Sequence, residues 1–225
     1  MNRAFALLLD LDGTLLNTAP DMGGALNRLR REEGLAPLPY ETIRPNVSHG
    51  AARLVHLGFP EATGAMFERL RRRFLDLYAE NIAAETRLFD GLDAVLGEAD
   101  RRGLPWGVVT NKPAWLTDPL LRQLALDRRA ACVVSGDTLT ERKPHPMPLL
   151  HAAEVVGMKP AHCVYVGDAE RDIQAGRAAG MTTLIAAYGY IDSNDDIGQW
   201  QANGIVEQPG ELLEWLTDAP MESGQ

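Results

Sequence analysis

The sequence contains little cysteine, no long apolar run and no excess of positive charge. Its two cysteines, Cys132 and Cys163, lie in separate apolar segments without the spacing of a metal site or a redox pair. We therefore expect buried free thiols, which suit a reducing cytoplasm. No stretch approaches the roughly 20 apolar residues of a membrane span, and the early apolar run is short for a signal peptide. These absences favour a cytoplasmic protein that does not enter a membrane.

The charge balance narrows the class of partner further. The 225 residues carry a formal net charge of -9. Such a chain is a poor ligand for nucleic acid or for an anionic membrane surface, so we expect neither as a partner. A small anionic substrate is compatible with this charge, but only if local cations or a metal ion bind it.

The chain has no repeats and is organised as alternating strands and helices. An apolar run at 4–9 resembles a central strand, and alternation resumes after about residue 91, which predicts right-handed crossovers and a parallel sheet. The expected strands are 4–9, 106–111, 131–135, 163–167 and 182–186, and the expected helices are 92–102, 114–124, 147–156 and 171–179. In the tail we expect a loop at 192–198, a short helix at 210–217 and a mobile end from 218.

A helical block interrupts this alternation directly after the first strand. Between residues 21 and 81 strand-like runs disappear, and Met22–Arg31 and Ala65–Glu80 carry apolar residues at helical spacing. The sequence therefore predicts an α/β core domain from 1–17 and 84–225, with a helical cap domain inserted at 18–83. An insertion at this point lies above the carboxyl ends of the strands, where it can exclude water and select substrate.

Polar side chains follow each predicted strand at that same edge. Asp10 and Asp12 end the first strand, Thr110 and Asn111 end the second, Lys143 follows the third, and Asp168 and Asp172 follow the fourth. Carboxylates, a hydroxyl, an amide and an ammonium at one edge suit phosphoryl transfer. A carboxylate can attack phosphorus, Mg²⁺ binds hard oxygen ligands, and a lysine stabilises the developing charge.

Four segments in order resemble the motifs of the haloacid dehalogenase superfamily. They are Asp10-Leu-Asp12-Gly-Thr-Leu15, Val109-Thr-Asn-Lys-Pro113, Lys143-Pro-His-Pro146 and Gly167-Asp-Ala-Glu-Arg-Asp172. The helical block is similar to the C1-type cap of that superfamily. The resemblance implies an α/β fold, a Rossmann-like doubly wound parallel sheet with an inserted helical cap, and a Mg²⁺-dependent phosphatase.

A narrower resemblance is to the phosphoglycolate phosphatase branch, which includes the bacterial N-acetylmuramic acid 6-phosphate phosphatases. Leu15-Leu-Asn-Thr-Ala-Pro-Asp21 and Tyr188-Gly-Tyr190 contribute to it. Either 2-phosphoglycolate or N-acetylmuramic acid 6-phosphate is then an expected substrate. Asn17 departs from the branch, which commonly has aspartate there, and we expect this change to affect the flap after the first strand rather than the catalytic groups.

The resemblance also implies roles for the four acids. Asp10 would be the nucleophile and a Mg²⁺ ligand. Asp12 would be the general acid and base, and its backbone carbonyl would bind the metal. Asp168 would be a further Mg²⁺ ligand, and Asp172 would orient the metal shell.

The same resemblance assigns the remaining core residues to the phosphate. Thr110 and Asn111 would hold the phosphoryl oxygens, and Lys143 would pair with both the nucleophile and the phosphate. Thr110 and Lys143 therefore count as catalytic as well as substrate-binding residues.

The cap contributes a polar loop between helical segments. Ser48, His49 and Gly50 match a Ser-x-Gly pattern of the family's cap and are expected to contact substrate. A net acidic protein also needs cap cations to bind an anion, for which Arg44 and Arg53 are candidates.

Two other activities fit the same residues. A sugar phosphomutase would use them with a cap that keeps water from the phosphorylated aspartate. A phospho-accepting signalling domain would also combine acids with threonine and lysine on a parallel sheet, but it needs only about half this length and no helical insertion. The sequence leaves open whether the protein is a monomer or a homodimer.

Overall fold

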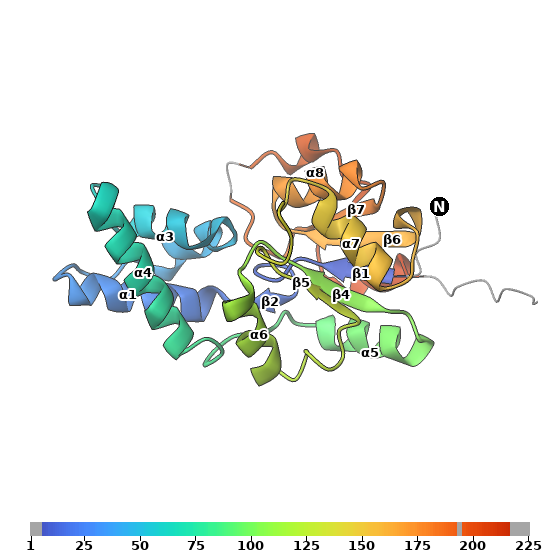
Figure 1. The fold of residues 1–225 in the computed structure, drawn as a ribbon, viewed down its shortest axis with the longest axis horizontal. Coiled ribbons are helices and arrows are strands. Elements are labelled where there is room, and N and C mark those ends of the chain that lie inside the picture. The colour runs from blue at the N-terminus through green and yellow to red at the C-terminus, as the bar shows by residue number, and fades with distance from the viewer. Residues whose placement is uncertain (1–5, 193–194, 217–225) are drawn as a thin grey trace, which may run out of the picture.

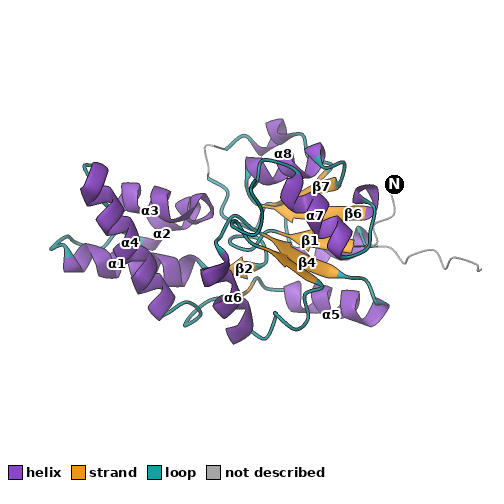
Figure 2. Cartoon of the chain, in the orientation of Figure 1, coloured by secondary structure: helices purple, strands orange, loops and turns teal. Residues whose placement is uncertain are grey.

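A parallel six-stranded sheet forms the centre of the molecule. The computed structural model describes residues 6–192 and 195–216, so the predicted mobile end from 218 lies outside the described residues. The strands of the sheet are β1 (Ala6–Leu9), β4 (Trp106–Val109), β5 (Cys132–Val134), β6 (Cys163–Gly167), β7 (Thr182–Ala186) and β8 (Gly204–Val206). The expected α/β fold with a parallel sheet is thus confirmed (Figure 2).

The order of the strands places β1 at a reversal of the chain path. The sheet runs β5-β4-β1-β6-β7-β8, which is the doubly wound order of a Rossmann fold when its strands are counted along the chain. Leu9 pairs with Val108 on one side and with Val166 on the other. In such sheets ligands bind outside the carboxyl end of the strand at the reversal. For this chain that position lies directly after Leu9.

Alternating side chains of β1 enter two different apolar layers. Leu7 and Leu9 belong to one buried cluster, and Leu8 belongs to the cluster on the opposite face. Successive residues of a strand point to opposite faces, and a continuous apolar strand is therefore covered on both. The first layer includes α5 (Leu92–Arg102) and α6 (Ala114–Gln123), and the second includes α7 (Met147–Val155) and α8 (Glu170–Ala178).

Four further helices gather at the end of the sheet where β1 ends (Figure 1). They are α1 (Ala19–Glu32), α2 (Tyr40–Ile43), α3 (Gly50–Gly58) and α4 (Gly64–Glu80). These helices contact one another, with α1 against α4 as the largest contact among them. The division into a core at 1–17 and 84–225 and a cap at 18–83 stays a prediction, and we use "cap" below for α1–α4 and the loops between them.

Two short strands join the two groups of elements. β2 (Leu16–Asn17) and β3 (Arg87–Leu88) pair antiparallel where the chain leaves the sheet and returns. The carboxylate of Asp21 accepts hydrogen bonds from the backbone N–H of Glu85 and Thr86 and from the Thr86 hydroxyl. Asn17, which stands where the branch commonly has aspartate, accepts a hydrogen bond at Oδ1 from the Tyr190 hydroxyl at 2.8 Å.

The secondary structure after Ala186 differs most from what the sequence predicted. We expected Thr182–Ala186 to be the last core strand, but β8 follows it and pairs with it in parallel. Three residues that begin with a glycine carry too little periodicity to predict a strand. The expected helix at 210–217 is a 3-10 helix, Pro209–Glu214.

The two cysteines are free, as the sequence predicted. Burial raises the pKa of both Cys132 and Cys163 to about 11, which is typical of unreactive thiols in an apolar setting. Among the described residues, none of the helices has both the length and the apolar character to cross a membrane.

Candidate active site

The carboxyl ends of β1, β4 and β6 deliver three polar side chains to one place. Asp10 follows β1, Thr110 follows β4 and Asp168 follows β6, and all three are buried. The N–H of Asp10 donates to the Val166 carbonyl at 2.9 Å, so the sheet ladder holds the backbone one residue beyond the strand. The side chain of Asp10 therefore starts from a rigid support.

Lys143 lies between two of the buried carboxylates. Its Nζ is 2.8 Å from Oδ1 of Asp10 and 2.8 Å from Oδ1 of Asp172. It also donates to the Val109 carbonyl at 2.8 Å and to the Tyr165 hydroxyl at 2.7 Å. Burial raises the pKa of Asp172 above its ordinary value, although the Lys143 ammonium acts in the opposite direction. One ammonium thus offsets part of the negative charge that these acids bring.

Asp168 is the third carboxylate of this cluster. Its Oδ2 accepts hydrogen bonds from the Ser48 hydroxyl at 2.6 Å and from the Tyr190 N–H at 2.9 Å. Burial, together with the charges of Asp10 and Asp172, raises the pKa of Asp168 to about 7. Burial is thus the main cause of the raised pKa of Asp168, and the two neighbouring carboxylates add to it.

The donor set of the cluster fits a divalent cation. Carboxylate oxygens of Asp10, Asp168 and Asp172 lie within 4.8 Å of one another, and all three residues are buried. Mg²⁺ prefers hard oxygen ligands and is usually bound by one or two carboxylates together with substrate phosphate. A cation here would oppose both causes that raise the pKa of Asp168, its burial and the negative charges of Asp10 and Asp172.

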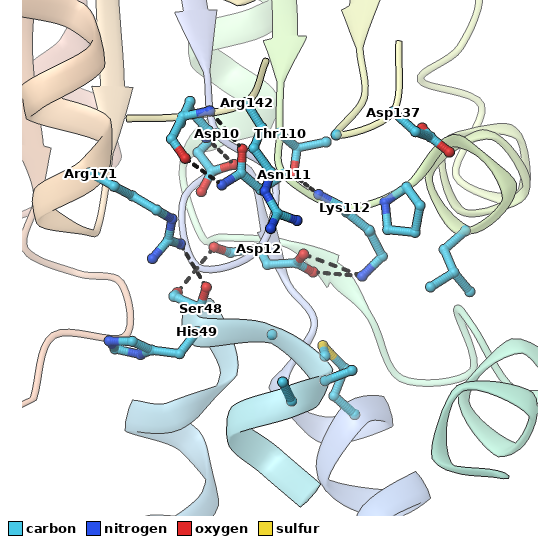
Figure 3. A pocket seen from close by; sticks show the side chains of 18 of the residues that line it. Asp10, Asp12, Ser48, His49, Thr110, Asn111, Lys112, Asp137, Arg142 and Arg171 are labelled. Carbon is cyan, nitrogen blue, oxygen red and sulfur yellow. Dashed lines mark hydrogen bonds and ion pairs between the residues drawn. The ribbon is translucent and has the colours of Figure 1, made fainter. Parts of the chain in front are cut away.

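Arg171 adds a second cation that we did not expect. It lies in the first turn of α8, and its guanidinium donates to the Ser48 carbonyl at 2.6 Å (Figure 3). Burial by itself lowers the pKa of Arg171, but the charges of Asp172 and Asp10 raise it above its ordinary value. The only signal in the sequence is its place directly before Asp172, and nothing along the chain predicts that it meets the cap.

The carboxylate of Asp12 turns away from the cluster of three acids. Lys112 Nζ lies 3.0 Å from Oδ1 and 3.2 Å from Oδ2 of Asp12 (Figure 3). The Thr18 hydroxyl donates to Oδ1 at 2.7 Å. The backbone carbonyl of Asp12 is 3.3 Å from the Ser48 hydroxyl, which also binds Asp168. The carbonyl rather than the carboxylate of Asp12 therefore lies next to the cluster.

Thr110 and Asn111 differ in the hydrogen-bonding groups that they leave available to a ligand. Oγ1 of Thr110 accepts a hydrogen bond from the Lys112 N–H at 3.1 Å, so its own proton can be donated to a ligand. Asn111 donates to the Lys143 carbonyl at 2.9 Å and accepts from the Lys143 N–H at 3.1 Å. The amide thus joins the loops after β4 and β5 and fixes the backbone of Lys143.

A cleft of about 730 Å³ adjoins these groups and is lined by residues of both the core and the cap. The predicted site residues that line it are Asp10, Asp12, Ser48, His49, Gly50, Thr110, Asn111 and Lys143. Burial lowers the pKa of His49, and the nearby charges of Arg171 and Arg53 lower it further. His49 therefore faces the cleft as a neutral imidazole near neutral pH.

The two candidate cap arginines lie elsewhere. Arg44 donates to the carbonyls of Tyr188 at 3.2 Å and Gly189 at 2.8 Å, and its guanidinium lies 5.0 Å from the centre of the Tyr190 ring. Arg53 donates to Asn46. Neither is among the residues that line the cleft. Arg44 holds the cap against the loop after β7. A direct contact of Arg44 or Arg53 with substrate stays a prediction, and the positions of these side chains do not favour it.

Comparisons with known proteins agree with this geometry. The family model described as "Haloacid dehalogenase-like hydrolase" matches residues 7–186. A phosphoglycolate phosphatase of Xanthomonas campestris is 45% identical over 209 residues, which are 93% of this chain and 95% of the relative. An N-acetylmuramic acid 6-phosphate phosphatase of Pseudomonas aeruginosa is 39% identical and covers 96% of both chains.

Solved structures show the same architecture. The crystal structure of a predicted phosphoglycolate phosphatase from Haemophilus somnus superposes with a TM-score of 0.84 at 28% identity. The match covers 95% of this chain and 98% of the other chain. The similarity therefore extends over the sheet and the cap together.

Substitution of Gly13 tests how closely the turn after β1 approaches Asp168. Gly13 has a φ of +85°, and an added Cβ would lie 2.0 Å from Oδ2 of Asp168. We expect Gly13→Ala to lower the free energy of unfolding by ~1–3 kcal/mol, since both the positive φ and the displaced carboxylate are unfavourable. Urea unfolding followed by circular dichroism measures this change.

The matched control is Gly97→Ala on the exposed side of α5. Among the residues that the structure describes, no heavy atom lies within 4 Å of a Cβ at this position, apart from those of its own helical turn and chain neighbours, and the residue is helical. We expect the control to raise the free energy of unfolding by about 0.5–1 kcal/mol. A Gly13→Ala protein as stable as the wild type would contradict the close approach.

Proposed function

The chain belongs to the haloacid dehalogenase-like hydrolase family, and from this premise we propose that it is a phosphatase that hydrolyses phosphomonoesters of small anionic metabolites. One observation carries the proposal. At the carboxyl end of β1, Lys143 pairs with Asp10 inside a cluster of three buried carboxylates that adjoins a cleft. A carboxylate beside a cation is a nucleophile that can approach an anionic phosphate.

Asp10 begins the reaction. One carboxylate oxygen of Asp10 attacks phosphorus, the bond from phosphorus to the ester oxygen breaks, and an aspartyl phosphate forms. Lys143 reduces the repulsion between the carboxylate and the phosphate because its ammonium lies 2.8 Å from Asp10. Thr110 donates a hydrogen bond to a phosphoryl oxygen as the charge on that oxygen develops.

Asp12 moves the protons. In its protonated form it gives a proton to the departing alkoxide. The carboxylate that results, which is the form that pairs with Lys112, then takes a proton from the water that attacks the aspartyl phosphate and so regenerates the acid. The second attack forms a new bond between phosphorus and oxygen, breaks the bond to Asp10 and releases inorganic phosphate. Both steps require the Asp12 carboxylate to stay outside the cluster around Asp10, and this is where it lies.

Mg²⁺ fits the acidic cluster as a cofactor. Asp10 and Asp168 would hold it through their carboxylates and Asp12 through its carbonyl oxygen. Asp172 orients the shell, because its Oδ1 binds Lys143 and its Oδ2 accepts the Ala169 N–H at 3.1 Å. When bound, the ion supplies positive charge that offsets the charge of the phosphate.

The cap side of the cleft favours a substrate with a second polar group. Ser48, His49 and Gly50 line it, and Arg171 enters from the core side. Both 2-phosphoglycolate and N-acetylmuramic acid 6-phosphate carry a carboxylate besides the phosphate. We retain both as proposed substrates, since the relatives named for each resemble this chain over nearly its full length.

Replacement of the nucleophile tests the proposed reaction. The wild type should hydrolyse p-nitrophenyl phosphate with Mg²⁺ and lose this activity in excess EDTA. Asp10→Asn should lower the rate by at least about a thousandfold, because the amide cannot form the aspartyl phosphate. Absorbance of p-nitrophenolate measures both effects.

Asp93→Asn, a substitution at an exposed aspartate of α5, is the control for loss of charge alone and should retain the wild-type rate. The proposal fails if Asp10→Asn remains active or if EDTA has no effect on the wild type.

A panel of phosphorylated metabolites tests the substrate class. We expect kcat/KM for 2-phosphoglycolate or for N-acetylmuramic acid 6-phosphate to exceed that for phosphates without a carboxylate by about tenfold or more, because a built polar contact rejects analogues that lack its partner. Phosphate release measures the rates. Equal rates across the panel would refute the substrate class but leave the chemistry intact.

A further inference from the structure

Lysine is rare in this chain, and Lys112 is one of two lysines that are buried. Lysine occurs only at Lys112, Lys143 and Lys159, although the chain has 22 lysine and arginine residues. Lys143 and Lys112 are both buried, and Lys159 is exposed. A buried ammonium is unfavourable unless it is paired and hydrogen-bonded, so the partners of Lys112 indicate what it does.

The partners of Lys112 lie on both sides of the cleft. Its Nζ contacts both carboxylate oxygens of Asp12, at 3.0 and 3.2 Å, and the hydroxyl of Tyr78 at 3.0 Å. The ammonium also lies 4.5 Å from the centre of the Tyr78 ring. Asp12 belongs to the turn after β1, whereas Tyr78 belongs to α4 of the cap. The three groups, of which Lys112 and Tyr78 are buried and Asp12 is partly exposed, form what we call the Asp12–Lys112–Tyr78 network.

The backbone of Lys112 is fixed to the sheet edge. Its N–H donates to Oγ1 of Thr110 at 3.1 Å, and its carbonyl accepts the N–H of Gly136 at 2.8 Å. The side chain therefore extends from a rigid base toward Asp12. This rigidity distinguishes Lys112 from a flexible surface lysine.

From this geometry we propose that Lys112 is a positioning residue for the general acid and base, and that Tyr78 supports it from the cap. The inference rests on the proposed phosphatase function. By pairing with both oxygens, Lys112 keeps the Asp12 carboxylate on the leaving-group side of the site. Without Lys112, only the Thr18 hydroxyl at 2.7 Å from Oδ1 would hold the carboxylate among the residues that the structure describes. Asp12 could then turn toward whatever cation the acidic cluster holds, where it would transfer a proton less effectively.

Tyr78 completes the network with a neutral hydroxyl. Tyr78 is buried, and burial raises its pKa to about 12, although the Lys112 charge lowers it in part. The hydroxyl accepts a hydrogen bond from the ammonium without adding charge. Because Tyr78 is part of α4, the place of the proton-transfer group depends on the cap being seated against the sheet.

Two substrates of similar shape separate positioning from a general loss of structure. p-Nitrophenyl phosphate releases a stable phenolate that needs no proton, whereas benzyl phosphate releases a basic alkoxide that does. We expect Lys112→Met to lower kcat/KM for benzyl phosphate by about tenfold or more, and to leave that for p-nitrophenyl phosphate within about threefold. Tyr78→Phe should also lower kcat/KM for benzyl phosphate relative to that for p-nitrophenyl phosphate, but less strongly than Lys112→Met does.

The control Lys159→Met makes the same substitution at an exposed lysine and should change kcat/KM for neither substrate. Asp12→Asn should show the largest loss for benzyl phosphate. If Lys112→Met does not fold by circular dichroism, Tyr78→Phe, which keeps the ion pair, carries the test.

The possible outcomes separate the inference from the function on which it rests. Equal losses for both substrates in Lys112→Met and Tyr78→Phe would show a merely structural role and overturn the inference. A selective loss in Asp12→Asn without one in Lys112→Met would also overturn it and leave the phosphatase intact. An unselective effect of Asp12→Asn would instead overturn the role of Asp12 in the proposed function.

Discussion

The site depends on the pairing of Lys143 with buried carboxylates at the end of β1. Asp10, Asp168 and Asp172 are removed from water and lie within a few ångströms of one another, so their charges repel. The ammonium between Asp10 and Asp172 makes this arrangement possible, and the parallel sheet holds its members in place through β1 and β6. The remaining negative charge is what a divalent cation would offset, and its positive charge would also attract an anionic phosphate.

Asp12 differs from the other three acids in that it pairs with a second lysine, Lys112. Lys143 pairs with Asp10 and Asp172 in the acidic cluster, whereas Lys112 pairs with Asp12 outside it. The cap meets both parts, because Ser48 binds Asp168 and the Tyr78 hydroxyl binds Lys112. Movement of the cap would therefore alter the environment of the acidic cluster and of the proton-transfer group together. In the proposed function, this coupling connects the cap, which would select substrate, with the residues that would perform the reaction.

Most groups at the strand ends, and Ser48 in the cap, could be predicted from the sequence. The contacts that join Lys112 and Arg171 to the cap could not. Asp10, Thr110 and Asp168 were predictable because parallel strands end at one edge and each residue directly follows an apolar run. Tyr78 was not, because it lies in an apolar helical stripe and its partner is 34 residues away. Arg44 shows the reverse, since a cap arginine suggested a substrate contact but binds carbonyls of the loop after β7.

Titration of the protein with Mg²⁺ tests most directly whether the acidic cluster is a cation site. Isothermal calorimetry should show one ion bound per chain, together with a rise in the melting temperature as Mg²⁺ is added, because an ion that binds only the folded state stabilises it. Asp168→Asn, which removes one buried carboxylate without changing the size of the side chain, should abolish both effects. Binding of Mg²⁺ to Asp168→Asn with wild-type affinity, or no binding to the wild type, would contradict the account.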